Sequence, residues 1–145
     1  TEMVSILLEH RATTGLQDLV EAAFSGKEMV RLLVQQGVDP NAQFSKTHEF
    51  PFLVSKAGDT PMTAVVGMDS IAPINSLLEN GADLSTKGRL QMTPLVAAAD
   101  ACAYFSTKYI LAQKKLVSPE EHRAAVLAAE RSGCQLLVNF LRRFR

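Results

Sequence analysis

The chain has 145 residues, of which 47% are hydrophobic and 21% charged, a composition that suits one domain with a real core and excludes a disordered chain. Lys+Arg and Asp+Glu are both 15, so the net charge is zero, which argues against a globally basic nucleic-acid binder. The charge is nevertheless divided. Residues 1–107 carry 7 basic and 12 acidic residues, and residues 108–145 carry 8 and 3, so we expect an electrically polar molecule with a basic C-terminal end.

The predicted elements repeat along the chain as two helices and a turn. Residues 1–14 are interpreted as the second helix of a partial first repeat, as though the chain were cut from a longer protein. The remaining predicted units are a repeat over 15–42, a long loop over 43–59, repeats over 60–86 and 87–117, and a C-terminal capping repeat over 118–145. Met62 and Leu95 are 33 residues apart, which is a period typical of helical repeat proteins.

The ends of the predicted helices carry the expected capping residues. Thr60-Pro61 and Thr93-Pro94 each place a hydroxyl where it can cap free N–H groups, followed by a proline at the first helical position. Ser118 begins the last repeat in the same manner. Gly37 and Gly81 follow apolar stretches and suit left-handed C-caps. Because one helix pair cannot bury its own apolar face, the units are predicted to stack.

These motifs resemble those of ankyrin-repeat proteins. The resemblance rests on Thr60-Pro61-Met62, Thr93-Pro94-Leu95, Gly81-Ala82-Asp83 and Gly37-Val38-Asp39-Pro40-Asn41-Ala42. The pattern departs from the family where Thr63 and Val96 replace the usual histidine and where Lys114 replaces the terminal glycine of the third unit. The resemblance implies an all-α ankyrin-repeat solenoid of about four and a half degenerate repeats with one lengthened finger loop.

The sequence contains no motif that indicates catalysis or metal binding. It has no Gly-x-Ser-x-Gly nucleophile motif, no HExxH or CxxC zinc spacing and no glycine-rich phosphate loop. His10, His48 and His122 fall in different units. Asp100, close to Cys102, is better explained as a polar residue at a helix end than as a catalytic acid. We therefore expect no enzyme activity, no catalytic residue, no cofactor and no metal site.

The two cysteines, Cys102 and Cys134, occupy nearly equivalent positions of neighbouring units. Equivalent helices of neighbouring repeats pack about 8–10 Å apart, whereas a disulfide needs Cα atoms closer than about 7 Å. We therefore predict two reduced, partly buried cysteines and a reducing compartment. No apolar stretch approaches the roughly 20 residues needed to span a bilayer, and the N-terminus lacks a signal-peptide layout, so a cytoplasmic location is expected.

The family resemblance implies that a partner protein binds through the finger loops and the inner-helix face. The 43–59 loop is about ten residues longer than a normal finger, and long loops are usually functional or disordered. Its Phe50 and Phe52, with the neighbouring Lys56, are candidate partner contacts. The alternative is that both phenylalanines fold back and cover the neighbouring inner helix.

Two further sets of residues are candidate contacts. Lys87 and Arg89 project from the next finger, where the alternative is a solvated turn. Phe24 and Tyr104 are the best apolar candidates on the inner-helix face, where the alternative is packing beneath a neighbouring finger.

The leading functional hypothesis is a non-enzymatic protein–protein interaction module that is monomeric by itself and takes no small-molecule substrate. A second hypothesis is a regulatory or targeting ankyrin domain of a larger enzyme, or of a secreted bacterial effector that acts in the host cytosol. A third is binding of nucleic acid or an anionic surface by the basic C-terminal repeats. The alternative is that these basic residues only form the polar terminal cap that a repeat protein needs to stay soluble.

Overall fold

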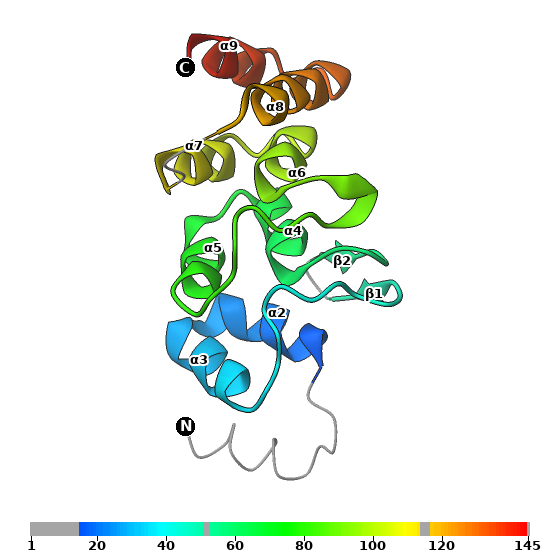
Figure 1. The fold of residues 1–145 in the computed structure, drawn as a ribbon, viewed down its shortest axis with the longest axis vertical. Helices are drawn as coiled ribbons and strands as arrows, with labels where there is room; N and C mark the ends of the chain where they lie inside the picture. Colours follow the sequence, from blue (N-terminus) through cyan, green and yellow to red (C-terminus); the bar gives the residue numbers. More distant parts are fainter. Residues whose placement is uncertain (1–14, 51–52, 114–116, 145) are drawn as a thin grey trace.

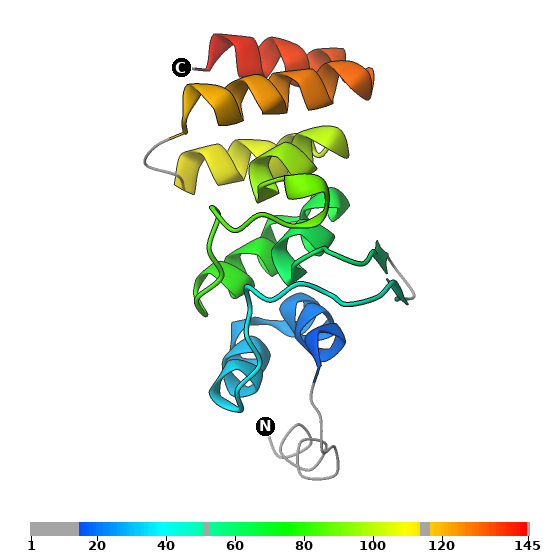
Figure 2. The same ribbon diagram turned by 45° about the vertical axis from the view of Figure 1, so that its right-hand side comes forward.

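The computed structural model describes residues 15–50, 53–113 and 117–144, and within these it is mostly helical. Figures 1 and 2 show the helices arranged in pairs that lie one above another along the longest axis of the molecule. The helices are α2 (Leu16–Ser25), α3 (Lys27–Gln35), α4 (Pro61–Val65), η1 (Val66–Met68), α5 (Ile71–Leu78), η2 (Arg89–Gln91), α6 (Pro94–Asp100), α7 (Tyr104–Gln113), α8 (Pro119–Arg131) and α9 (Gln135–Arg143).

The pairs are α2–α3, α4–α5, α6–α7 and α8–α9, and each packs on the next. Helices α2, α4, α6 and α8 contact one another in succession and form an inner row, while α3, α5 and α7 form an outer row. The first predicted helix, over 1–14, lies outside the described residues. Within the described residues, therefore, four helix pairs stack on one another.

The predicted N-terminal caps of three inner helices are confirmed. The hydroxyl of Thr60 accepts a hydrogen bond from the N–H of Thr63 at 3.2 Å, and that of Thr93 accepts one from Val96 at 3.4 Å. Ser118 accepts one from the N–H of Glu121 at 3.1 Å. These bonds satisfy N–H groups that have no partner inside the helix.

The predicted C-caps are also confirmed, because Gly37 and Gly81 have φ values of 102° and 100°. A left-handed backbone of this kind strains any residue that carries a Cβ. After Gly81 the chain is joined to the preceding unit by Asn41, whose amide donates to the Gly81 carbonyl at 3.0 Å and accepts from the N–H of Asp83 at 2.7 Å. The loops of the first two units are thus held together by one side chain.

The core is one continuous apolar cluster that runs between the two rows of helices. Its largest fully buried members include Leu19, Ile74, Leu95, Ile110 and Leu137. The contact between α6 and α8 is rich in alanine. Its buried residues include Ala98, Ala99, Ala125, Ala128 and Ala129. Small side chains let the two inner helices approach closely, and this close contact joins the last pair to the rest of the stack.

The 43–59 loop is folded back on itself. Strands β1 (His48–Glu49) and β2 (Val54–Ser55) pair antiparallel, with His48 opposite Ser55 and Glu49 opposite Val54. The base of the loop is closed by hydrogen bonds from the Phe44 N–H to the Asp59 carbonyl at 2.7 Å and from the Gly58 N–H to the Phe44 carbonyl at 2.8 Å. The hairpin projects from one edge of the stack, as Figure 1 shows.

The turns that join inner to outer helices share a left-handed residue. Asp69, Cys102 and Gly133 occupy this position in the last three pairs, with φ values of 55°, 60° and 73°. Asp69 also reaches the next unit, where its carboxylate Oδ1 accepts a hydrogen bond from the backbone N–H of Ser106 at 2.9 Å. This bond satisfies a free N–H at the start of α7 from outside the helix.

We expect Asp69→Ala to lower the free energy of unfolding by about 1–2 kcal/mol, because the Ser106 N–H loses its acceptor and alanine tolerates a left-handed backbone poorly. Asp69→Asn keeps an acceptor oxygen and a side chain that tolerates this backbone, and is expected to lose about half as much or less. Urea unfolding of the two variants beside the wild type measures the difference, and equal losses would contradict a capping role.

The prediction that both cysteines are reduced is wrong for this structure. Cys102 and Cys134 form a disulfide, with their Cα atoms 5.8 Å apart. The helix-to-helix spacing used in the prediction does not apply, because neither residue lies inside a helix. Cys102 lies in the turn after α6, and Cys134 is the N-cap of α9. The turns of the two pairs bring the two Cα atoms within the distance that a disulfide needs.

No helix in the described parts of the chain has the length and apolar character needed to cross a membrane. Within residues 15–50, 53–113 and 117–144, no three His, Cys, Asp or Glu side chains gather in a way that could hold a metal ion.

Candidate functional site

The 86–92 loop, which precedes α6, exposes an apolar side chain on a strained backbone. Leu90 and Gln91 both have φ values of 60°, although neither is a glycine, and the side chain of Leu90 is 74% exposed. Left-handed conformations of ordinary residues are costly, and they persist only where the surroundings enforce them.

The structure shows what enforces this conformation. The Gly88 N–H donates to the Met92 carbonyl at 2.8 Å, which closes the loop, and the Gln43 amide donates to the Lys87 carbonyl at 3.2 Å, which ties it to the preceding loop. A Cβ on Gly88 would lie only 2.7 Å from the hydroxyl of Thr63, so the loop backbone lies directly against α4. The loop is therefore a rigid support that presents Leu90.

Helix α8 faces this loop with one continuous stripe, formed by Glu120, Ala124, Leu127 and Arg131. These residues follow the spacing i, i+4, i+7 and i+11, which places them on one face of a helix. The stripe runs from an acidic end, through an apolar centre where Leu127 is 57% exposed, to a basic end. We call it the α8 stripe.

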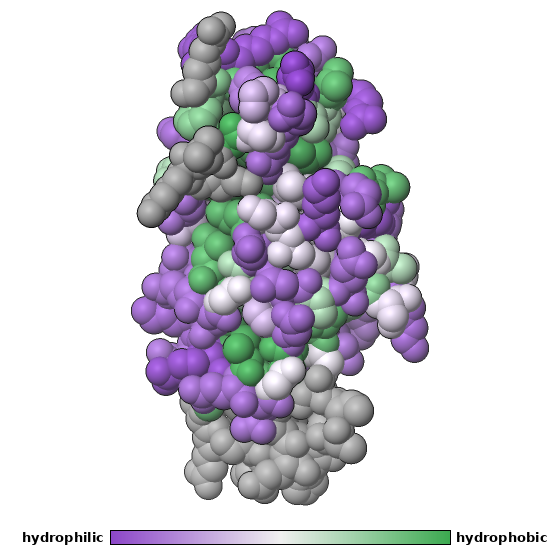
Figure 3. All heavy atoms as spheres, viewed as in Figure 1, coloured by the Kyte–Doolittle hydropathy of each residue, from purple (hydrophilic) through white to green (hydrophobic). Residues whose placement is uncertain are grey.

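The 86–92 loop and the α8 stripe form the two walls of an open cleft of about 510 Å³. Met92 and Val96 add apolar surface between the walls. The hydroxyl of Thr93 donates to the carboxylate of Glu121 at 2.6 Å and fixes the start of α6 against α8. On the face drawn in Figure 3, apolar side chains reach the surface only in small patches among polar ones.

This cleft can bind a side chain, and several of its polar groups are already committed to structure. The Ser118 and Thr93 hydroxyls cap helices, and the Glu120 carboxylate lies 3.9 Å from the Arg123 guanidinium. Apolar contact with Leu90 and Leu127, bordered by charge, is the interaction that the cleft offers.

Of the predicted contact residues, Lys87 lies at the cleft and is exposed. Arg89, two residues on, turns away from it: its backbone and side chain lie beside Gly58, and its Nε is buried without a hydrogen-bond partner in the described structure. The cleft therefore brings together Lys87 and residues that were not predicted from the sequence as partner contacts.

The three predicted contact residues of the 43–59 loop differ in their surroundings. Phe50 is only 7% exposed and joins the core cluster, with the His48 ring against it at 4.5 Å, an arrangement that favours the alternative of a phenylalanine that covers the core. Phe52 lies outside the described residues. Lys56 is exposed, and its backbone N–H donates to the Asp59 carboxylate at 2.9 Å.

The two remaining aromatic candidates do not line the cleft. Phe24 is near the end of α2 and is 37% exposed. Tyr104 is the first residue of the outer helix α7 and does not lie on the inner-helix face. Its ring packs against Phe105 and against Phe140 of α9, each at 5.6 Å.

Among the cleft residues, Leu90, Leu127 and Arg131 were not predicted as partner contacts. No sequence signal marks the left-handed backbone that exposes Leu90. The α8 stripe could have been predicted from the sequence. Ser118-Pro119 fixes the start of the helix, and counting from there places Glu120, Leu127 and Arg131 on one face.

The chain was compared with protein-family models and with curated proteins. No family model matches the chain. The chain is 33% identical over 150 residues to an ankyrin repeat and KH domain-containing protein of Caenorhabditis briggsae, a match that covers 97% of this chain and 5% of that protein. The chain thus spans about 5% of the length of the relative. The match suggests that this chain contains ankyrin repeats.

Proposed function

We propose that the stacked helix pairs are degenerate ankyrin repeats. The 33-residue spacing from Met62 to Leu95, the Thr-Pro caps of α4 and α6, and the left-handed glycines after the outer helices support this assignment. The similarity to a protein named for its ankyrin repeats points in the same direction.

The function that we propose for this stack is non-enzymatic binding of a partner protein at the cleft between the 86–92 loop and the α8 stripe. The observation that carries the proposal is the exposure of Leu90 and Leu127, 74% and 57%, across a cleft whose loop wall is held by hydrogen bonds. Apolar residues that are held in place lose little conformational entropy when a partner covers them, so contact with them contributes efficiently to affinity.

The ion pairs of α8 and α9 favour a protein partner over a polyanion. Arg142 lies 3.3 Å from Glu130, and Arg123 lies 3.9 Å from Glu120, so two cations of the basic end face carboxylates. A nucleic-acid or anionic-lipid site needs several uncompensated cations on one surface. If that alternative held, binding would weaken steeply as salt is raised.

A second candidate is that this region is one domain of a larger protein and regulates or targets it. The relative favours this possibility, because the matched region makes up only 5% of its length. Binding at the cleft would then place the larger protein beside its partner, and any chemistry would belong to other regions.

We expect the double substitution Leu90→Ser and Leu127→Ser to reduce partner capture at least tenfold, because both exposed apolar anchors of the cleft are lost. The change should leave the melting temperature within a few degrees of the wild type, since exposed side chains contribute little to stability. The immobilised wild-type chain and variant are compared by quantitative mass spectrometry of the proteins that each retains.

Leu136→Ser is the matched control. Leu136 is 69% exposed on α9 and does not line the cleft, so this variant should retain the same proteins as the wild type. Equal retention by the double variant, or an equal loss with Leu136→Ser, would exclude the cleft as the binding surface.

A further inference from the structure

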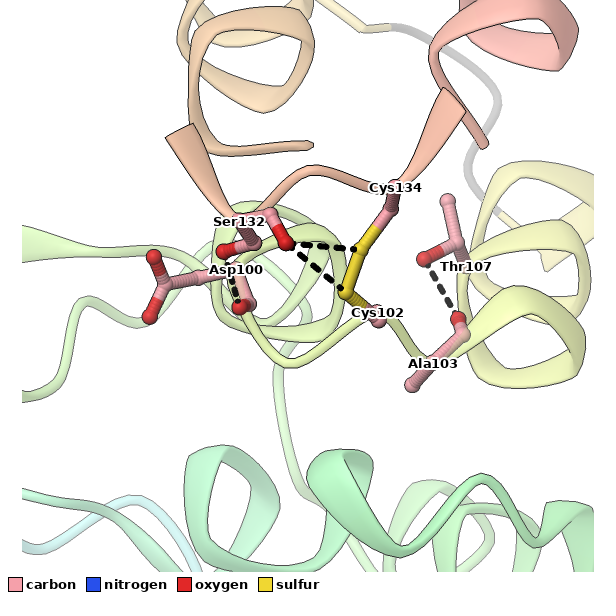
Figure 4. The surroundings of a disulfide bond; sticks show 6 residues. All are labelled: Asp100, Cys102, Ala103, Thr107, Ser132 and Cys134. Carbon is pink, nitrogen blue, oxygen red and sulfur yellow. Dashed lines mark hydrogen bonds between the residues drawn. A yellow bond between two sulfur atoms is a disulfide. The ribbon is translucent and has the colours of Figure 1, made fainter. Parts of the chain in front are cut away.

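The Cys102–Cys134 pair joins the turns of the last two helix pairs. Cys102 occupies the left-handed position of the turn between α6 and α7, and Cys134 directly precedes α9. Figure 4 shows the two sulfur atoms side by side between the turns. The bridge closes a segment with a sequence separation of 32 residues that contains α7 and α8.

The same site also accommodates the reduced cysteines. The carbonyl oxygen of Ser132 lies 3.8 Å from Sγ of Cys102 and 3.6 Å from Sγ of Cys134. In the dithiol form, each S–H group therefore has an acceptor within reach. Independently of the sulfurs, the Ser132 hydroxyl donates to the Asp100 carbonyl at 2.6 Å and holds the two turns together. Neither redox state requires the turns to separate.

Solvent reaches the pair. Cys102 is exposed and Cys134 is half-buried, unlike structural cysteines, which are usually buried and inert. Cys134 is also the N-cap of the nine-residue helix α9, whose positive end stabilises a thiolate at that sulfur. These properties are those of cysteines that exchange with small thiols and disulfides.

We propose that Cys102 and Cys134 form a reversible redox lock between the α6–α7 and α8–α9 pairs, with a small disulfide such as glutathione disulfide as the oxidant. The Cys134 thiolate attacks the small disulfide, forms a mixed disulfide and releases one glutathione thiolate. The Cys102 thiolate then attacks Sγ of Cys134, forms the protein disulfide and releases the second glutathione thiolate. Two protein thiols are oxidised, one glutathione disulfide is reduced to two thiols, and reduced glutathione reverses both steps.

The lock acts on the last helix pair in particular. The bridge restricts the unfolded chain over the linked segment, and this restriction favours the folded state. Without it, α8 and α9 are held to the stack by the alanine contact of α6 with α8 and by the ring contact of Tyr104 with Phe140. Two hydrogen bonds, from Thr93 to Glu121 and from Ser132 to Asp100, complete the attachment. Reduction is therefore expected to loosen α8–α9 first.

The test equilibrates the whole chain in buffers of defined reduced and oxidised glutathione, then counts free thiols by alkylation and intact mass. We expect a transition between two free thiols and none, within one monomer. The oxidised chain should melt about 5–10 °C above the reduced chain, and the amides of α8 and α9 should exchange hydrogen faster after reduction.

Two variants isolate the bond. Cys134→Ala removes one thiol, and Cys102→Gly removes the other while relieving the left-handed backbone, as Gly133 does in the next unit. Both should melt at one temperature with or without reductant, and Cys102→Gly should melt no lower than the reduced wild type. Two free thiols that persist in oxidised glutathione, bridges between chains, or equal melting of the oxidised and reduced chains would each overturn the proposal.

Discussion

Replacing Leu95 by alanine is expected to lower the free energy of unfolding by about 3–4 kcal/mol. Leu95 is fully buried in α6, which packs against α4 on one side, α8 on the other and α7 behind. The substitution removes buried apolar surface and leaves a cavity at the point where three helix pairs meet. Rigid helices on all sides prevent the cavity from collapsing. Urea unfolding followed by circular dichroism measures the change.

Leu90→Ala is the matched control, since it makes the same chemical change five residues earlier on a side chain that is 74% exposed. Its effect should not exceed about 0.5 kcal/mol. A large loss for Leu90→Ala, or a loss below about 1 kcal/mol for Leu95→Ala, would contradict the assignment of Leu95 to the junction of the stack.

The second large effect is expected at the hairpin, where Phe50→Ala should lower the free energy of unfolding by about 2–3 kcal/mol. Phe50 is 7% exposed, packs within the core cluster and lies against the His48 ring, and its N–H donates to the Leu53 carbonyl at 2.8 Å. The expected loss is smaller than at Leu95 because a short hairpin can partly close over the gap. Thermal and urea unfolding both report it.

Val54→Ala is the control that shows whether the stability lost in Phe50→Ala comes from burial of the side chain or from a weaker preference for the hairpin. Val54 lies in β2 of the same hairpin but is 50% exposed, so its replacement should change stability by less than about 1 kcal/mol. If Phe50→Ala left stability unchanged and reduced only partner capture, Phe50 would be a contact residue. Burial of its side chain would then contribute nothing to the free energy of unfolding.

The caps and the repeat period could be predicted because they depend on local chemistry. A threonine hydroxyl before a proline caps a helix wherever it occurs, so Thr60 and Thr93 marked the starts of α4 and α6. A glycine after an apolar stripe meets the left-handed requirement at Gly37 and Gly81 without help from distant residues. The order of the helix pairs followed from these boundaries.

The candidate site was harder to predict, because its residues owe their positions to other parts of the fold. Lys87 was identified from its place in a finger, but the same reasoning also selected Arg89, which turns away beside Gly58. Phe50 was predicted to be a contact residue because it lies in a long loop, whereas the folded hairpin buries its side chain in the core. Tyr104 was assigned to the inner face, whereas a helix boundary at that residue places it on the outer row.

The sequence by itself determined the helical character of the chain and the caps of its inner helices, because hydrophobic periodicity and capping act within a few residues. Only the tertiary structure decided the left-handed conformation of Leu90, which depends on the contacts of Gly88 with Thr63 and of Gln43 with Lys87. It also decided the Cys102–Cys134 bridge. The spacing of helix axes set a distance too long for a disulfide, whereas the turns at the ends of those helices bring the Cα atoms to 5.8 Å.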